Sequence, residues 1–157
     1  MAVDNKDRRI VAELVKDSRQ TTSKLSKKLN IPITTVHNRI KKLVKEGVII
    51  NYTINLDHNQ LGRPIPAYIG VTIDYNVSGR KIKQVDVAKE LKKIDGVYEV
   101  YIMTGGSDIL VKVLAVDIQD LNNLVTEKLR NVTGVDKTQT AIILKELWDK
   151  LLSVYLN

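Results

Sequence analysis

Amide, hydroxyl and basic side chains between residues 34 and 45 have the chemistry needed to contact a nucleic acid duplex. At 100° per residue, one face of a helix over this stretch carries five of them: Thr34, Asn38, Lys41, Lys42 and Lys45. An Asn amide can pair with both edge atoms of adenine, whereas Thr and Lys side chains contact bases or phosphates. The spacing predicts a DNA-reading helix over about Ile33 to Glu46, although an ordinary solvated helix face would also be basic.

Further candidates border this face. Thr35 and His37 lie on its shoulders, and Thr22 and Lys24 come from the preceding helix. Arg39 lies beside the apolar seam opposite the face, so we expect it to brace the domain or reach a phosphate rather than read a base. The seam consists of Val36, Ile40 and Leu43.

Three short helices are expected to position these side chains. Asp4 is a good N-cap for the first helix, and the Thr21–Thr22 pair can cap the second. Asn30 can take the left-handed conformation that ends the second helix, and Pro32 marks the turn before the third. Because proline has no side-chain oxygen, we expect Thr34 to supply the third cap and the helix to begin later.

Positive charge is concentrated in the same part of the chain. Residues 1–60 contain 12 Lys and Arg against 6 Asp and Glu, whereas residues 61–157 contain 13 against 12. A basic helical head on a near-neutral body is typical of a protein that binds the DNA backbone.

A connecting segment is expected after the third helix. Gly47 ends that helix, and residues 48–50 and 52–54 have the composition of β-structure, either a wing or a strand joining two domains. Residues 57–66 are polar and rich in Gly and Pro, as in a linker. We therefore divide the chain into a DNA-binding domain (1–50), a connecting strand and linker (51–65) and a second domain (66–157).

The second domain is predicted to have the order β-α-β-β-α-β. Its strands are expected at residues 67–74, 97–104, 107–116 and 137–144. Its helices are expected to direct these residues inward: Val87, Leu91 and Ile94, then Leu121, Leu124, Val125 and Leu129. This order is that of a ferredoxin-like fold, so the fold class is α+β, a winged helix-turn-helix domain followed by a ferredoxin-like domain.

An internal repeat supports this order. A shift of 38 residues places Leu91, Lys92, Ile94, Gly96 and Val97 on Leu129, Arg130, Val132, Gly134 and Val135. In both copies a helix ends at Gly and a Val opens the next strand. Chance likeness of two helix ends is the alternative.

Catalytic chemistry is not expected. The chain has no Cys, its two histidines (His37 and His58) are far apart, and Asp95, Asp108 and Asp117 are dispersed. We therefore expect no enzymatic activity, no metal and no cofactor. The loop Thr104-Gly105-Gly106-Ser107-Asp108 is either a plain hairpin turn or a site whose exposed backbone N–H groups hold the carboxylate of a small effector.

No stretch approaches the roughly 18 apolar residues that cross a bilayer, so no membrane partner is expected. The absence of Cys fits a reducing compartment, so a cytoplasmic location is expected. Residues 147–155 are apolar at i, i+4 and i+8 and contain the only Trp. We expect this segment to pack on its own domain or on a partner subunit; a role at a membrane surface is a minor alternative.

These residues resemble the Lrp/AsnC (feast/famine) family of transcription regulators over nearly the whole chain. The family's first helix follows D-x-x-D-x-x-I-L-x-x-L, matched by Asp4, Asp7, Ile10, Val11 and Leu14. Its third helix follows T-V-x-x-R-[IV]-x-x-L-x-x-x-G-V-I, matched by Thr35, Val36, Arg39, Ile40, Leu43, Gly47, Val48 and Ile49. Each piece alone is a weak signal, and together they are a strong one.

The resemblance implies that residues 66–157 form a regulatory and oligomerisation domain that dimerises through its sheet. It also implies that the dimers assemble into tetramers or octamers and bind promoters. Small effectors, often amino acids, would bind between dimers. The family's loop reads close to Gly-Asp-Tyr-Asp. Here the corresponding run is Gly105-Gly106-Ser107-Asp108, so the inner acidic and aromatic positions are missing. That departure either changes which ligand fits or removes amino-acid sensing.

The sequence thus predicts a homo-oligomeric, sequence-specific transcription regulator. Its expected partners are double-stranded DNA, further copies of itself and a candidate amino-acid effector. Two alternatives stay open, namely an oligomer that mainly senses a ligand and an effector-independent or DNA-compacting protein. An enzyme on a ferredoxin-like scaffold is the weakest alternative, because no nucleophile–base pair can be assembled.

Overall fold

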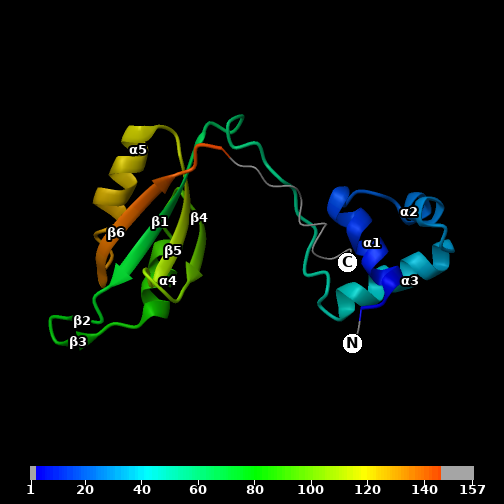
Figure 1. Ribbon diagram of the computed structural model, residues 1–157, viewed down its shortest axis with the longest axis horizontal. Coiled ribbons are helices and arrows are strands. Elements are labelled where there is room, and N and C mark those ends of the chain that lie inside the picture. Colours follow the sequence, from blue (N-terminus) through cyan, green and yellow to red (C-terminus); the bar gives the residue numbers. More distant parts are fainter. Residues whose placement is uncertain (1–2, 146–157) are drawn as a thin grey trace. The chain divides into compact units, whose positions relative to one another are not determined.

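The computed structural model describes residues 3–145, which divide into two units with the boundary between Asn55 and Leu56 (Figure 1). The first unit contains three helices: α1 (Asn5–Lys16), α2 (Thr22–Leu29) and α3 (Ile33–Lys45). The second unit contains the strands β1 (Ile65–Ile73), β2 (Asn76–Val77), β3 (Arg80–Lys81), β4 (Val97–Ile102), β5 (Ile109–Ala115) and β6 (Val135–Ile142). Its helices are α4 (Gln84–Lys92), α5 (Ile118–Asn123) and the π-helical stretch η1 (Leu124–Leu129) that continues α5.

The caps of the first two helices are those predicted from the sequence. The Asp4 side chain accepts a hydrogen bond from the Asp7 N–H (2.9 Å), and the Asp7 side chain accepts one from the Asp4 N–H (3.2 Å). Thr21 caps α2 through the Lys24 N–H, and Asn30 ends it with φ = 53°. A small core joins the helices, formed by Ile10, Leu14, Leu25, Leu29, Ile31 and Val36.

The cap at the start of α3 differs from the one expected. The helix begins at Ile33, directly after Pro32, without a side-chain cap. The Val36 N–H already donates to the Pro32 carbonyl at 3.0 Å, so Thr34 lies inside the first turn and cannot act as the cap. The range predicted from the spacing, about Ile33 to Glu46, is therefore confirmed, whereas the expectation of a later start capped by Thr34 is wrong. Proline restricts its own φ, here −53°, to a value suited to a helix entrance.

The predicted strand after α3 is not formed in this chain. Gly47 ends the helix with φ = 73°, and the N–H groups of Val48 and Ile49 donate to the Leu43 carbonyl at 2.9 and 3.1 Å. The described residues 48–57 contain no β-strand. A strand needs a neighbouring strand to pair with, and β-favouring composition alone cannot provide one.

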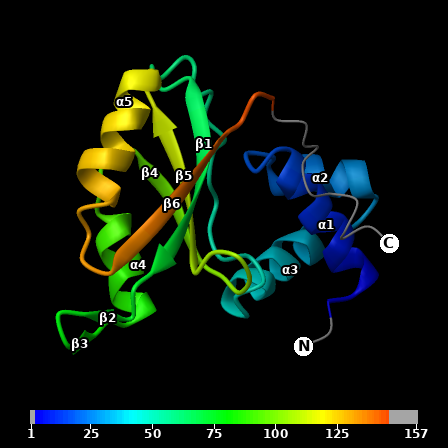
Figure 2. The same ribbon diagram turned by 60° about the vertical axis from the view of Figure 1, so that its left-hand side comes forward.

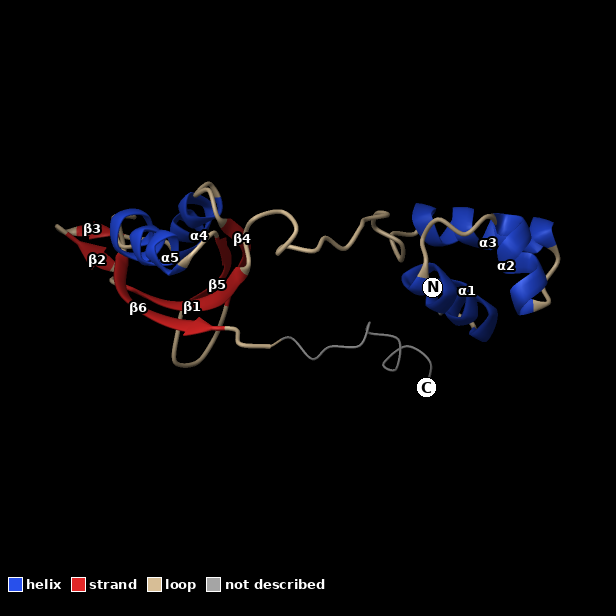
Figure 3. Cartoon of the chain, turned by 90° about the horizontal axis from the view of Figure 1, so that it is seen from above, coloured by secondary structure: helices blue, strands red, loops and turns tan. Residues whose placement is uncertain are grey.

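The second unit is a four-stranded antiparallel sheet in the order β4-β5-β1-β6, the ferredoxin-like arrangement (Figure 2). Both helices, α4 and α5, lie on the same face of the sheet (Figure 3). β4 and β5 are shorter than predicted, because residues 103–108 form the loop between them. β1 begins two residues earlier than predicted, and β6 begins and ends two residues earlier. The β2–β3 hairpin and the π-helical stretch were not predicted.

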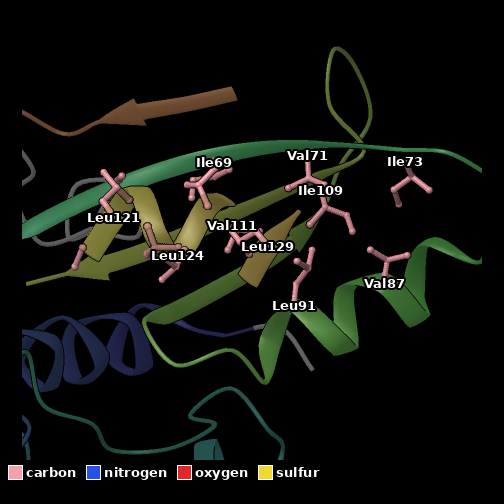
Figure 4. Packing of buried hydrophobic residues seen from close by; sticks show 14 residues of the cluster. Ile69, Val71, Ile73, Val87, Leu91, Ile109, Val111, Leu121, Leu124 and Leu129 are labelled. Carbon is pink, nitrogen blue, oxygen red and sulfur yellow. The ribbon is translucent and has the colours of Figure 1, made fainter. Parts of the chain in front are cut away.

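The core of the second unit lies between the sheet and its two helices. Alternate residues of β1 are buried and face the inward side chains of α4 and α5 (Figure 4). The predicted inward residues of both helices that are buried are Val87, Leu91, Leu121, Leu124, Val125 and Leu129. Ile94, also predicted to point inward, is partly buried.

The internal repeat is also structural. Gly96 and Gly134 both have positive φ, 91° and 96°. In the two copies the Ile94 and Val132 N–H groups donate to the Leu91 and Leu129 carbonyls, each at 3.2 Å. The same turn therefore closes both helices and starts both following strands.

Candidate DNA-binding face and effector loop

The predicted face of α3 is exposed in the first unit. The side chains of this face are all exposed to solvent: Thr34, Asn38, Lys41, Lys42 and Lys45. His37, at the edge of the face, is exposed as well. On the opposite side Val36 and Leu43 are fully buried and Ile40 is half-buried. Lys42 lies 4.0 Å from Glu46, which leaves its ammonium largely solvated. The helix is thus held by its apolar seam and presents amide, hydroxyl and ammonium groups outward.

Arg39 braces the helical unit. Its Nη1 donates to Asp4 Oδ2 at 2.6 Å and to Asp7 Oδ1 at 2.8 Å, which joins α3 to the start of α1. Asp7 is buried, so the guanidinium supplies the charge that this carboxylate needs. The same ion pair and the hydrogen bond from the Asp7 N–H lower the pKa of Asp4. Of the two roles expected for Arg39, this geometry favours the brace.

The start of α2 contributes the other predicted DNA-contacting residues. Thr22 is the first residue of the helix and is half-buried, while Lys24 is exposed. The turn between α2 and α3 is held by the Ser26 hydroxyl, which donates to the Ile31 carbonyl at 2.6 Å. Arg9 of α1 donates to the Leu29 carbonyl at 2.8 Å and ties the end of α2 to α1. Thr35 is half-buried beside the exposed face of α3.

Sequence reasoning missed a second ion-pair cluster, around Glu13. This carboxylate is buried, accepts a hydrogen bond from Lys16 at 2.9 Å and forms an ion pair with Lys28 of α2. The hydrogen bonds from Lys28 and Lys16 lower the pKa of Glu13. Glu13 follows Ile10 by three residues and so lies on the buried stripe of α1, which could have revealed it. Lys28 is therefore engaged within the unit.

The loop from Thr104 to Asp108 joins β4 to β5. Thr104, Gly105 and Gly106 are exposed, and a Cβ on either glycine would meet open space. Ser107 packs on β1, because a Cβ at Gly70 would lie 2.5 Å from the Ser107 hydroxyl. The loop is thus a hairpin with an exposed glycine tip and an anchored base.

Asp108 is the anchor. Its Oδ2 accepts a hydrogen bond from the Ile73 N–H (2.8 Å) and its Oδ1 accepts one from the Tyr75 hydroxyl (2.7 Å). Gln84 donates to the Asp108 carbonyl at 2.7 Å. The carboxylate raises the pKa of Tyr75 because it accepts the phenolic proton in a hydrogen bond. Each carboxylate oxygen accepts one hydrogen bond within the unit, so Asp108 fixes the base of the loop on β1 and on the segment after it.

Comparison with known proteins assigns both units. The winged helix-turn-helix DNA-binding family matches residues 3–50, and the Lrp/AsnC ligand binding domain family matches residues 67–151. The chain belongs to the Lrp/AsnC family of transcription regulators. It combines a DNA-binding head with a ligand-binding domain, as the resemblance in the sequence implied.

Two relatives illustrate this membership. The chain is 41% identical over 140 residues to an uncharacterized HTH-type transcriptional regulator of Pyrococcus furiosus, covering 89% of this chain and 91% of that protein. It is 36% identical to the HTH-type transcriptional regulator LrpA of Pyrococcus horikoshii, covering 92% of this chain and 99% of that protein.

Solved structures have the same fold. AsnC of Escherichia coli matches with a TM-score of 0.83 and 25% identity over 97% of this chain and 99% of that one. A transcriptional regulator of Neisseria meningitidis in complex with L-Met matches with a TM-score of 0.85 and 25% identity over 96% and 95%.

Two remaining predictions concern membranes and the C-terminal segment. Within residues 3–145, no helix combines the length and the hydrophobicity needed to cross a bilayer. The segment Leu147–Tyr155 lies outside the described residues, so its predicted packing stays a prediction.

Proposed function

We propose that the protein regulates transcription by placing α3 in the major groove of DNA. The exposed face of α3, anchored from behind by Arg39, is the observation that supports this proposal. Thr34, His37 and Asn38 read base edges in this arrangement, with Thr35 beside them. The remaining contacts are to phosphates and come from Thr22, Lys24, Lys41, Lys42 and Lys45.

Paired substitutions test this assignment. Lys41→Ala is expected to weaken binding to all sequences and to reduce the slope of log affinity against log salt by about one, because one phosphate contact is lost. Asn38→Ala is expected to relax the preference at particular base pairs by about 1–3 kcal/mol. Fluorescence anisotropy with an operator and with scrambled DNA over a salt series measures both. Lys93→Ala, on an exposed Lys of the second unit, is the control. An Asn38→Ala variant with an unchanged sequence preference would refute the assignment.

We infer that the protein acts as a homo-oligomer, at least a dimer and in higher order a tetramer or octamer. The sheet face away from α4 and α5 carries Tyr68, Tyr101 and Leu110, and the Lys112 ammonium lies 5.9 Å from the Tyr68 ring centre. Lys112, Glu99 and Gln139 lie on the same face, so it is a mixed aromatic and polar surface that a second copy can cover. Two recognition helices would then meet successive major grooves about 34 Å apart, so the operator should be roughly palindromic. Analytical ultracentrifugation and selection of bound sites from random DNA measure the two expectations.

We propose an α-amino acid as the effector. The ligand-binding family and the L-Met complex of the Neisseria relative support this class. The exposed N–H groups of Gly105 and Gly106 suit a carboxylate, with Thr104 and Ser107 beside them. Because Asp108 is engaged with Ile73 and Tyr75, the ammonium group needs another partner, which a neighbouring subunit can supply. Calorimetry with a panel of amino acids tests this; no heat across the panel would favour an effector-independent or DNA-compacting protein.

The proposal includes no enzymatic activity, no cofactor and a cytoplasmic location, where a chromosomal regulator meets its DNA. Among residues 3–145, no three His, Asp or Glu side chains gather as a metal site. Any turnover that Asp108→Asn abolishes would contradict this part of the proposal.

A further inference from the structure

An open apolar groove lies in the first unit, between α1 and the segment that follows α3. Its volume is about 690 Å³. Six of its apolar lining residues are Val11, Leu14 and Val15 of α1 and Ile50, Tyr52 and Ile54 of the following segment. Lys16, Asp17 and Arg19 also line it. None of the six apolar residues belongs to the predicted DNA-contacting residues of α2 and α3.

The groove exposes more apolar surface than an isolated side chain would. Ile50 is 88% exposed and Ile54 72%, and Val15 across from them is 42% exposed. Single exposed apolar residues are ordinary, but a contiguous patch in a hollow marks a surface that binds another apolar group. Val48 and Ile49 are held by hydrogen bonds to the Leu43 carbonyl, whereas residues 50–55 are exposed and have no strand partner in the described chain.

We propose that the chain's own C-terminal segment, residues 147–155, docks in this groove. Its sequence has Leu147, Leu151 and Tyr155 at spacings of four, and Trp148 and Leu152 at the same spacing one residue further on. Together they form one apolar stripe at helical spacing. Such stripes are the anchors with which an amphipathic helix binds an apolar groove.

The point at which the described chain ends favours this occupant. Lys145 lines the same pocket of about 310 Å³ in the second unit as Leu56 and Asp57. Asn55, the residue before Leu56, already lines the groove of the first unit. The C-terminal segment therefore starts close to the chain segment that leads directly into the groove. One intervening residue, Glu146, separates Lys145 from Leu147, and two peptide steps reach about 7 Å.

Docking in this position ties the segment after α3 to α1. Val15 and Ile50 lose contact with water, and residues 50–55, which are exposed in the described chain, acquire a packing partner. The C-terminal segment then acts as a clasp on the DNA-binding unit.

Disulfide cross-linking tests the proposal, because the chain has no native Cys. The variant Val15→Cys/Leu151→Cys is expected to form an intrachain disulfide in most molecules under mild oxidation, with loss of both free thiols. A second pair, Ile50→Cys/Leu151→Cys, covers the case in which the first pair does not meet the distance that a disulfide requires. Ser23→Cys/Leu151→Cys is the matched control, because Ser23 is exposed on α2 outside the groove, and it should stay reduced.

The cross-link distinguishes the possible occupants. Monomers that migrate faster on a non-reducing gel support docking of the chain's own segment. Disulfide-linked dimers would show that a second copy supplies the segment, and free thiols in both groove pairs would show that the groove holds something else. Either result overturns the proposal.

Trp148 provides an independent measurement, because it is the only Trp in the chain. Its emission is expected to lie to the blue of that of the urea-unfolded protein. Val15→Asp and Ile54→Asp should move it to the red and increase quenching by acrylamide. Val85→Asp, at a half-exposed Val of α4, should leave it unchanged. Emission already equal to that of unfolded protein, or unaffected by both groove variants, would overturn the proposal.

Discussion

Replacing Arg39 by Ala tests whether this residue holds the DNA-binding unit together. Arg39 neutralises Asp7, whose side chain is only 5% exposed, and Asp4, whose side chain is 52% exposed. Removing one partner of a buried ion pair costs about 3–5 kcal/mol, because the other charge is left unpaired. Arg39 itself is 27% exposed, so water reaches part of the cluster and reduces the penalty. We expect a loss of about 2–3 kcal/mol in the free energy of unfolding of the first unit.

Hydrogen exchange in the full chain measures this loss unit by unit. The amides of α1 and α3 are expected to lose protection by about 30- to 150-fold, since each 1.4 kcal/mol is a factor of ten. The amides of the β1–β6 sheet should keep theirs. Lys41→Ala, on the exposed face of the same helix, is the control and should change stability by less than about 0.5 kcal/mol.

A double-mutant cycle with Asp7→Asn isolates the ion pair. Once the carboxylate is gone, Arg39→Ala should cost about 1–2 kcal/mol less than it does in the native sequence. If Arg39→Ala leaves the exchange of α1 and α3 unchanged and lowers only the affinity for DNA, Arg39 contacts phosphate and the bracing role is refuted.

Three further outcomes are expected. Gly96→Ala and Gly134→Ala should each destabilise the second unit by about 2–4 kcal/mol in urea unfolding, because both glycines have positive φ and a Cβ would lie 2.6 Å from Leu124 or Ile82. Gly79→Ala, which has positive φ in open space, should cost only about 1 kcal/mol. Asp108→Asn should lower the pKa of Tyr75 toward its ordinary value in an ultraviolet titration, because the hydrogen-bonded carboxylate raises it; an unchanged pKa would contradict the bond. Glu13 has a pKa below its ordinary 4.5 in the folded state, so its contribution is complete above that pH and disappears as pH falls through the folded value. Glu13→Gln should therefore flatten the acid-side loss of stability of the first unit, and an equally steep loss would argue against the pairing with Lys28.

Periodic and local features could be predicted from the sequence. The buried seam and exposed face of α3, the caps Asp4 and Thr21, and the left-handed Asn30 all depend on residues within one or two turns of each other. Such features depend on backbone geometry and on which side chains avoid water, so spacing is sufficient to locate them. The repeat around Gly96 and Gly134 was visible for the same reason, because one kind of turn closes both helices.

Only the tertiary structure decided which distant groups meet. Arg39 binds Asp4 and Asp7, which lie more than 30 residues away in the sequence, and Tyr75 binds Asp108, 33 residues away. The sequence alone does not distinguish these three carboxylates from free surface charges. The segment after α3 has β-favouring residues but no strand, because pairing depends on a neighbour and not on composition. Local preference thus determined the elements, and long-range contacts determined which of their polar groups remain free for DNA or an effector.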